Sequence, residues 1–417
     1  MELKRVVVTG IGAITPLGKT VEEFWKNLST GVSGARPITR FDASNFKTKF
    51  ACEVLDFDPA EYMDRKEARK LDLYAQFALA STEMAFQDSG INLEESDMTE
   101  FGVIWGSGIG GSTTLMHEVI DYVKADFQPR FNPFLIPKMI ADIAAGHISI
   151  RYGLKGPNFS TVSACASSSN AIIDAYNYIR LGIATGFVTG GSEAAINEVG
   201  IGGFNAMKAI STRNDDPTAA SRPFDADRDG FVMGEGSVTL ILEEYERAKA
   251  RGAKIYAEII GAGMSADAHH LTAPHPEGDG AARVMAAAIK DAHISPDKID
   301  YINVHGTSTP LGDISEAFAI KKVFGDHAFK LNISSTKSMH GHLLGGAGAI
   351  EALACIMSIQ HNLVPPTINF QTPDPEIDYN LNFTFHKAQA RKVDYALSNT
   401  FGFGGHNASL IFKRFAE

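Results

Sequence analysis

Phe159-Ser-Thr-Val-Ser-Ala-Cys165-Ala-Ser-Ser-Ser-Asn-Ala-Ile-Ile-Asp-Ala-Tyr176 is the stretch from which the fold can be inferred. Its first five residues are aromatic, β-branched or hydroxyl-bearing, which predicts a short buried strand that ends in a turn. After Cys165 the pattern becomes helical, because Ile172, Tyr176 and Ile179 recur at spacings of four and three residues. Cys165 is therefore expected at the junction between a strand and a helix.

This position favours a reactive thiol. The unpaired N–H groups and the positive dipole end at a helix N-terminus stabilise anions, including a thiolate. The Ala and Ser residues around Cys165 leave room for a substrate, and the geometry resembles the nucleophile elbow of α/β-hydrolases with sulfur in place of oxygen. The alternative is a small buried cysteine that packs a helix against a sheet. This stretch alone does not decide between the two.

Overall composition excludes several classes of function. Of the 417 residues, 44% are hydrophobic and 21% are charged, which is typical of a globular protein with a substantial core. A net charge of −11 argues against a general binder of nucleic acid or anionic membranes. The three cysteines have no metal-type spacing, and neither a signal peptide nor a membrane-spanning run is evident. We expect a cytoplasmic protein.

The order of motifs in the first part of the chain recurs from about residue 254. The later segments 254–263, 301–306, 333–359 and 401–412 repeat, in the same order, the patterns of residues 5–18, 101–111, 159–176 and 231–242. The similarity lies in the pattern and not in the residues. It predicts two similar α/β halves, 1–253 and 254–417, with the active centre where equivalent loops meet.

Two glycine-rich loops are candidate cofactor sites. Residues 10–18 follow a strand, but their glycine spacing is wrong for a dinucleotide-binding turn and Pro16 interrupts the expected helix. The loop at 106–111 lacks the lysine of a phosphate-binding loop. We expect no cofactor.

Three motifs in the second half carry groups that suit a nucleophilic cysteine: His305 after a buried strand, Lys337 and His342 in one glycine-rich segment, and the loop 399–405. Such a cysteine needs backbone N–H donors for the oxyanion of the tetrahedral intermediate. We expect these donors from Cys165 and from the loop that contains Phe403 and Gly404. Phe403 is also expected to cover the entrance to an acyl channel.

Two histidines beside one cysteine suggest more than hydrolysis. One base suffices to cleave a thioester, whereas two neutral imidazoles can both donate to a thioester carbonyl and stabilise the enolate formed by loss of CO₂. Glu351 or Lys337 would fix their orientation. Alternatively, His340 and His342 could join His305 around a metal, although that loop contains no carboxylate or thiolate. We expect no metal. The His269–His275 segment is interpreted as a polar loop at the mouth of the site.

The motifs Val-Ser-Ala-Cys165-Ala-Ser, His305-Gly-Thr-Ser-Thr-Pro-Leu-Gly-Asp, Lys337-Ser-Met-x-Gly-His342-Leu-Leu-Gly and Asn-x-Phe-Gly-Phe403-Gly-Gly occur in one chain. Because it contains this set of motifs, the chain resembles the β-ketoacyl-[acyl-carrier-protein] synthases of the thiolase superfamily, and the resemblance extends essentially from end to end. The two histidines resemble the elongating members, and Ile109 resembles their second type. The resemblance implies a five-layer α-β-α-β-α fold, a homodimer and an acyl carrier protein as partner.

The resemblance also implies a role for each residue of the site in fatty acid elongation. Cys165 would take the acyl chain, and His305 and His342 would promote decarboxylation of a malonyl-carrier thioester whose carbanion attacks the acyl-Cys. Lys337 would support His342, and Glu351 would organise the network. A polyketide-type ketosynthase and a Cys–His thioester hydrolase remain alternative functions.

Two further sets of residues are expected to bind the substrate. By resemblance and apolar type, the wall of the acyl channel is assigned to Ile109, Phe134, Phe204 and Phe403. Because carrier proteins are typically acidic and this chain is acidic too, docking requires a local basic patch, which we assign to Lys66, Arg69, Lys70, Arg130 and Lys208. His340 and His406 occupy positions that are often Thr in this family.

Overall fold

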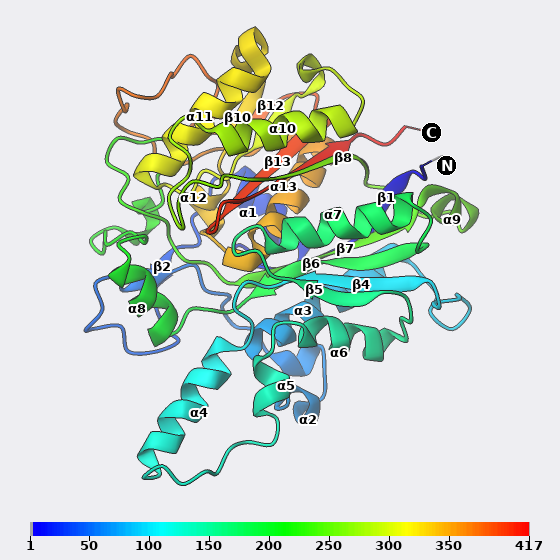
Figure 1. Ribbon diagram of the computed structural model, residues 1–417, viewed down its shortest axis with the longest axis vertical. Helices are drawn as coiled ribbons and strands as arrows, with labels where there is room; N and C mark the ends of the chain where they lie inside the picture. Colours follow the sequence, from blue (N-terminus) through cyan, green and yellow to red (C-terminus); the bar gives the residue numbers. More distant parts are fainter. Residues whose placement is uncertain (1–2, 417) are drawn as a thin grey trace.

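The computed structural model describes residues 3–416 and is built around a ten-stranded mixed sheet (Figure 1). The strands follow the order β10-β9-β13-β14-β8-β1-β7-β6-β4-β5. The first five in chain position are β1 (Val6–Ile14), β4 (Phe101–Gly106), β5 (Asn158–Thr161), β6 (Gly186–Glu193) and β7 (Gly236–Glu244). The other five are β8 (Ala257–Ala266), β9 (Tyr301–Asn303), β10 (Asn332–Ser334), β13 (Tyr395–Gly402) and β14 (His406–Lys413).

The sheet consists of two sets of five strands with the same internal order. When the strands of each set are numbered 1 to 5 along the chain, both sets have the spatial order 3-2-4-5-1 from the outer edge of the sheet to its centre. The sets meet where β1 pairs antiparallel with β8, through Val6–Val8 against Ala257–Ile259. The duplicated sequence pattern therefore corresponds to a repeated topology. The division of the chain at residues 253 and 254 stays a prediction.

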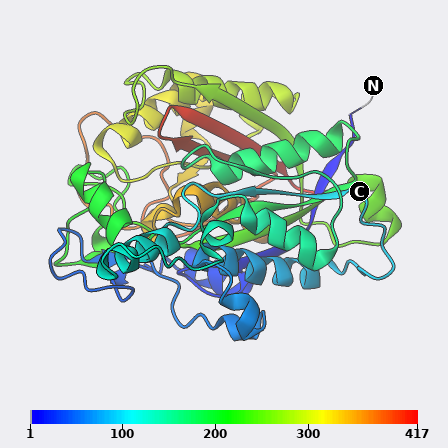
Figure 2. The same ribbon diagram turned by 60° about the horizontal axis from the view of Figure 1, so that its bottom comes forward.

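Helices lie on both faces of each set, which confirms the predicted thiolase-like five-layer arrangement (Figures 1 and 2). The central helices α7 (Ser167–Arg180) and α13 (Ala347–His361) pack against each other between the two sets. On the outer side of the first set lie α3 (Leu73–Ser89) and α6 (Ile143–Tyr152), and on that of the second lie α10 (Asp279–Asp291) and α11 (Pro310–Phe324). Smaller helices are α1 (Val21–Ser29), α2 (Arg65–Ala68), α4 (Ser112–Lys124), α5 (Leu135–Met139), α8 (Glu198–Ala206), α9 (Tyr245–Ala250) and α12 (Lys337–His340).

Burial on both faces explains the composition of the central strands. All nine residues of β1 are buried, and its sequence is a nearly continuous run of β-branched and small residues. The apolar face predicted for α7 is also present, since Ile172, Tyr176 and Ile179 are all buried. Within residues 3–416, no helix combines the length and the apolar character needed to cross a membrane.

Residues 61–90 contain two helices, α2 and α3, each with its own N-terminal cap. Asp64 caps α2 by accepting hydrogen bonds from the amides of Lys66 and Glu67. Asp72 then caps α3 through the amide of Tyr74. The second cap begins a new helix, because an Asp side chain bonds the free N–H groups of the first turn.

Candidate active site

Cys165 lies in a tight turn between β5 and α7, as the sequence predicts. β5 ends at Thr161, α7 begins at Ser167, and Ala164 has a positive φ of 50°. The Ser167 hydroxyl closes the turn by accepting from the Ser163 amide at 2.9 Å and donating to the Ala164 carbonyl at 2.7 Å. A residue other than Gly or Asn rarely takes this backbone conformation, so the turn is a strained one that presents the side chain of Cys165.

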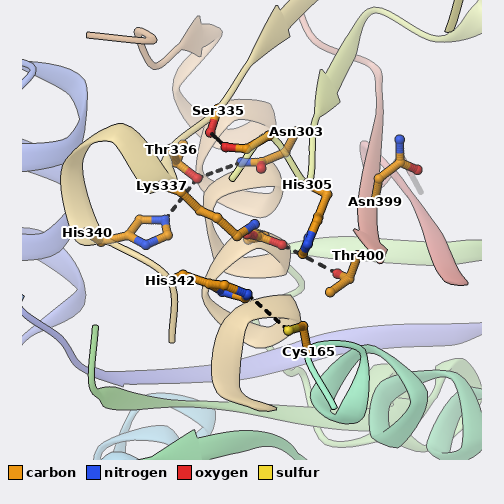
Figure 3. A network of polar contacts seen from close by, with 12 residues as sticks. Cys165, Asn303, His305, Ser335, Thr336, Lys337, His340, His342, Asn399 and Thr400 are labelled. Carbon is orange, nitrogen blue, oxygen red and sulfur yellow. Dashed lines mark hydrogen bonds and ion pairs between the residues drawn. The ribbon is translucent and has the colours of Figure 1, made fainter. Parts of the chain in front are cut away.

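The two predicted histidines meet this cysteine from the other half of the chain (Figure 3). His342 Nε2 lies 3.1 Å from Cys165 Sγ. The His305 and His342 rings are edge to face, with centroids 5.4 Å apart. The three side chains therefore line one space, with two imidazoles facing one sulfur.

This space is a cavity of about 490 Å³. Its wall includes the predicted channel residues Ile109, Phe204 and Phe403, and it includes Phe231, which the sequence did not single out. The rings of Phe204 and Phe403 are 6.4 Å apart, and Phe231 packs edge-on against His342. The cavity thus combines an apolar wall with the Cys–His–His group, which suits an acyl chain attached to sulfur.

Phe134, which was expected in the wall of the acyl channel, does not line the cavity of this chain. Phe134 is N-terminal to α5, is 38% exposed and does not line the cavity. Its ring instead lies 5.5 Å from the ammonium group of Lys70. An apolar residue type does not determine on which side of a loop the side chain points.

Lys337 and Glu351 form a buried ion pair behind the histidines. The hydroxyl of Thr400 donates to the other Glu351 oxygen at 3.4 Å and is itself 2.8 Å from the Ser169 hydroxyl. Burial raises the pKa of Glu351 to about 7, while the Lys337 charge opposes this rise. Lys337 therefore acts on the histidines through its charge, since its ammonium group is bonded to Glu351.

Both catalytic candidates among the histidines are neutral at pH 7. Burial is the main cause that holds the pKa of His305 and of His342 well below the usual 6.5, and the nearby Lys337 charge adds to it. Within residues 3–416, the Nδ1 atoms of both rings lack hydrogen-bond partners. Two neutral imidazoles can present N–H groups to a substrate oxygen, as decarboxylation to an enolate requires.

The helix N-terminus does not make Cys165 a thiolate at rest. Burial raises the pKa of Cys165 to about 12, although the Lys337 charge and a hydrogen bond from the Phe403 amide lower it. The helix N-terminus does not outweigh the loss of solvation at this sulfur. Cys165 is therefore a thiol at rest, and its proton must leave as the sulfur attacks.

The oxyanion donors are also more restricted than the sequence suggests. The Phe403 amide points at the Cys165 sulfur, whereas the Gly404 amide donates to the Leu271 carbonyl at 2.7 Å. Gly402 packs so closely on the turn that a Cβ there would lie 2.8 Å from the Ser163 carbonyl oxygen. The Gly404 amide is thus already bonded, which does not support it as an oxyanion donor, and Cys165 and Phe403 stay the predicted donors.

Sequence reasoning missed Glu316, which supports His305. This buried carboxylate accepts hydrogen bonds from the amides of His305 at 2.9 Å and of Gly306 at 2.8 Å, and from the Asn399 side chain at 3.1 Å. Burial raises its pKa to about 7. The available signal was the spacing of Asp313 and Glu316 by three residues in the helix that follows the His305 loop, which directs both toward that loop.

His340 does not join the other two histidines. Its Nδ1 lies 2.7 Å from the Gly341 carbonyl oxygen and its Nε2 lies 3.0 Å from the Thr336 hydroxyl. In the part of the chain that the structure describes, no three His, Cys, Asp or Glu side chains are grouped to hold a metal ion. The metal alternative thus has no geometric support. His406 is exposed, and its ring lies against Gly404.

The predicted docking residues are all exposed. Lys66 lies on α2, with Arg69 and Lys70 directly after it, and Lys70 is close to the segment that contains Arg130 and Phe134. Lys208 lies apart from these, after α8, where it lines the cavity.

Comparison with known proteins identifies the family. Models of the beta-ketoacyl synthase N-terminal and C-terminal domains match residues 3–248 and 256–371. Over 416 residues the chain is 51% identical to the 3-oxoacyl-[acyl-carrier-protein] synthase 2 of Synechocystis sp., covering 100% of this chain and 99% of that protein. The chain belongs to the beta-ketoacyl synthase family. Cys165 lies within the first match, and His305 and His342 lie within the second.

Solved structures agree with this assignment. A beta-ketoacyl synthase from Burkholderia phymatum is 37% identical, with a TM-score of 0.91, and the match covers 99% of this chain and 100% of that one. The AntDE ketosynthase, solved with its type II polyketide acyl-carrier protein AntF and a bound hexaketide, is 34% identical with the same coverage and a TM-score of 0.91.

The buried histidines of this synthase predict how its stability depends on pH. Burial lowers the pKa of His340 to about 3, whereas an unfolded histidine has a pKa of about 6.5. Below pH 6.5 the unfolded state binds a proton that the native ring does not, so this group makes stability fall as the pH falls. Replacing His340 with Thr should reduce the loss of unfolding free energy between pH 7.5 and pH 5.0 by about 2 kcal/mol.

Urea unfolding at both pH values measures this difference. The other buried titratable groups are present in both proteins, so their contributions cancel to first order in the comparison. Replacing the exposed His386 with Thr is the matched control and should leave the pH dependence as it is in the wild type. An equal loss for the His340→Thr variant and the wild type would show that His340 protonates as freely in the folded protein as in the unfolded one.

Proposed function

We propose that this chain catalyses decarboxylative Claisen condensation as an elongating β-ketoacyl-[acyl-carrier-protein] synthase of fatty acid synthesis. The observation that carries the proposal is the position of Cys165 at one cavity with two neutral histidines. The relative from Synechocystis sp. is named for this activity and matches over its whole length. No cofactor is needed for this chemistry.

The first half-reaction transfers an acyl group to Cys165. The sulfur attacks the carbonyl of an acyl-carrier thioester while its proton passes to His342 Nε2, 3.1 Å away. The amides of Cys165 and Phe403 stabilise the oxyanion that forms. The carrier thiolate then leaves and takes the proton, which returns His342 to its neutral form. The products are acyl-Cys165 and the free carrier thiol.

The second half-reaction extends the chain by two carbons. The malonyl-carrier thioester loses CO₂, and its carbonyl oxygen becomes an enolate that accepts hydrogen bonds from His305 and His342. The enolate carbon attacks acyl-Cys165, and the Cys165 thiolate leaves and takes up a proton from solvent. Lys337 and Glu351 hold their charges in fixed positions behind the rings, and Glu316 holds the backbone of His305.

A polyketide-type ketosynthase is the second candidate, because AntDE shares the fold at 34% identity. The higher identity to the Synechocystis enzyme favours fatty acid elongation. A thioester hydrolase would need only one base and water at the sulfur. Product analysis separates condensation by either type of ketosynthase from hydrolysis: condensation gives a β-ketoacyl-carrier, whereas hydrolysis gives the free acid.

Replacing single residues should separate the two half-reactions. Cys165→Ala should abolish the acyl-enzyme and all condensation, but CO₂ release from malonyl-carrier should persist because the two histidine donors remain. His305→Ala and His342→Ala should each lower decarboxylation by about a hundred- to a thousand-fold, the usual effect of losing one preorganised donor. An acyl-enzyme should still be detectable by mass spectrometry in the His305→Ala protein.

Cys355→Ala is the control, since Cys355 is buried in α13 and does not line the cavity. It should keep both half-reactions. Normal decarboxylation by either histidine variant would remove that residue from the oxyanion-binding pair. Free acid as the main product of the wild type would establish the hydrolase alternative.

For carrier docking we infer that the exposed basic side chains on and after α2 attract the acidic carrier. Changing Lys66 and Arg69 together to Glu should raise the KM for acyl-carrier about tenfold at low salt, since exposed interface charges mainly set the rate of encounter. Turnover of a small acyl-pantetheine thioester should stay unchanged. The control reverses Lys290 and Lys298, which are also exposed and lie on and after α10, on the outer side of the second set of strands. Equal loss on both substrates would contradict a docking role.

We also propose that a second copy of the chain covers the side of the molecule formed by α4, α6 and β5. β5 is an edge strand of the sheet, and α4 projects from the body below it (Figure 1). Large apolar side chains are exposed on this side, which an unpartnered soluble surface rarely keeps. They are Leu115, Val119, Ile120, Val123, Phe127, Phe131, Phe134, Ile136, Ile150 and Val162.

Sedimentation equilibrium tests the dimer. The wild type should show twice the chain mass of 44.9 kDa, and Val119→Glu combined with Val123→Glu should shift it toward the single-chain mass. Phe318→Glu, which places a charge at an exposed apolar position of α11, should not. A wild type of single-chain mass would contradict the proposal.

A further inference from the structure

Glu193 is a buried carboxylate that the mechanism above does not use. It is the last residue of β6 and is fully buried. Its Oε1 accepts hydrogen bonds from the Ser107 hydroxyl at 3.1 Å and the Ile109 amide at 3.2 Å. Its Oε2 accepts from the amides of Gly108 at 2.8 Å and Gly345 at 3.0 Å.

These donors come from two loops with different tasks. The first loop, 107–110, carries Ile109 to the wall of the cavity. The second, 343–346, directly follows His342, whose backbone is held on its other side by hydrogen bonds with Val232 and Gly234. Glu193 therefore helps to hold the segment that follows His342, and the same carboxylate holds the loop that carries Ile109.

The loops 107–110 and 343–346 contact each other at Gly108 and Gly345, where there is no room for a side chain. A Cβ at Gly345 would lie 2.1 Å from the Gly108 nitrogen and 2.7 Å from Glu193 Oε2. A Cβ at Gly108 would lie 2.9 Å from the same oxygen. A displacement of the 107–110 loop thus changes the hydrogen bonds that hold the 343–346 loop, because both share one carboxylate and one backbone contact.

We propose that Glu193 is a positioning residue that couples the occupancy of the acyl cavity to the placement of His342. A chain bound at Cys165 must fit against Ile109, and the shift of that loop is transmitted through Glu193 to the segment that holds the decarboxylating imidazole. The inference rests on the proposed function, and it adds a route by which the enzyme distinguishes a loaded from an empty sulfur.

The chemistry of the contact explains why a carboxylate is required. All four donors need acceptors, and both carboxylate oxygens accept. In Glu193→Gln one of the two positions becomes an NH₂ group, so in either orientation one pair of donors faces another donor. In Glu193→Asp the charge remains, but the side chain is one methylene shorter and cannot reach both loops in the same geometry.

The first test measures decarboxylation with the sulfur blocked. Cys165 is alkylated either with iodoacetamide or with an N-alkyl iodoacetamide that carries a long chain, and CO₂ release from malonyl-carrier is followed. In the wild type we expect the rates of the two forms to differ at least about fivefold, the lower range of typical coupling between sites. In Glu193→Gln and Glu193→Asp the two rates should become nearly equal.

Glu243→Gln is the matched control. Glu243 is also fully buried, but it is bonded to Thr9, Arg247 and Arg251 at the far end of β7. Glu243→Gln can lower the stability of the protein, but the ratio of CO₂-release rates between the two alkylated forms should stay as in the wild type. A wild-type ratio in both Glu193 variants, or equal rates for the two alkylated forms of the wild type, would overturn the proposal.

The second test uses only the wild-type protein, so it does not depend on how a variant folds. Hydrogen exchange of the amides of Ile109 and Gly345 is compared before and after alkylation with the long chain. We expect both to change together, and a change confined to residues 107–110 would overturn the coupling. A wild type that releases no CO₂ under any condition would refute the proposed function, whereas this exchange measurement needs no activity and still tests the role of Glu193.

Discussion

The close crossing of α7 and α13 is the constraint on which the site depends. Cys165 precedes one of these helices, and His342 precedes the other, so the distance between the helices sets the distance between sulfur and imidazole. Small residues make this crossing possible: a Cβ at Gly348 would lie 2.0 Å from the Ser169 hydroxyl oxygen, and the Ala349 amide bonds the Ser168 hydroxyl at 3.0 Å. Larger side chains there would separate the two halves of the catalytic group.

Burial around this crossing then determines the charge state of every group. The same desolvation raises the pKa of Cys165 and of Glu351 and lowers that of His305 and His342. An ion pair between Lys337 and Glu351 is tolerated because its members compensate each other, whereas a charged imidazole beside Lys337 is not. The result is a resting site with a neutral thiol and two neutral rings, in which charge appears only when a substrate reacts.

The sequence was sufficient to predict that Cys165, His305 and His342 lie together and that the architecture is repeated. Hydrophobic periodicity, the positions of glycines and the order of motifs indicated the turn at Cys165, the repeated halves and the two histidines. These features are either local in the sequence or recur along the chain. Glu193 was missed because three of its four donors are backbone amides, which leave no mark in the sequence. For Glu316 only its spacing from Asp313 pointed to the His305 loop. The thiol pKa and the orientation of Phe134 depend on burial and on loop direction, and no local pattern encodes either.

The three histidines near the site differ in one respect that matters for the chemistry. His340 has partners at both ring nitrogens, so its tautomer is fixed by the Gly341 carbonyl, which accepts from Nδ1. His305 and His342 lack a partner at Nδ1 within the described chain. An unpaired buried nitrogen costs roughly 1–3 kcal/mol, whether it is a donor or an acceptor. Neither tautomer of His342 is therefore locked: the ring can accept a proton from the thiol at Nε2 before acylation and present an N–H from the same nitrogen to the enolate afterwards. A fixed tautomer such as that of His340 would support only one of these two steps.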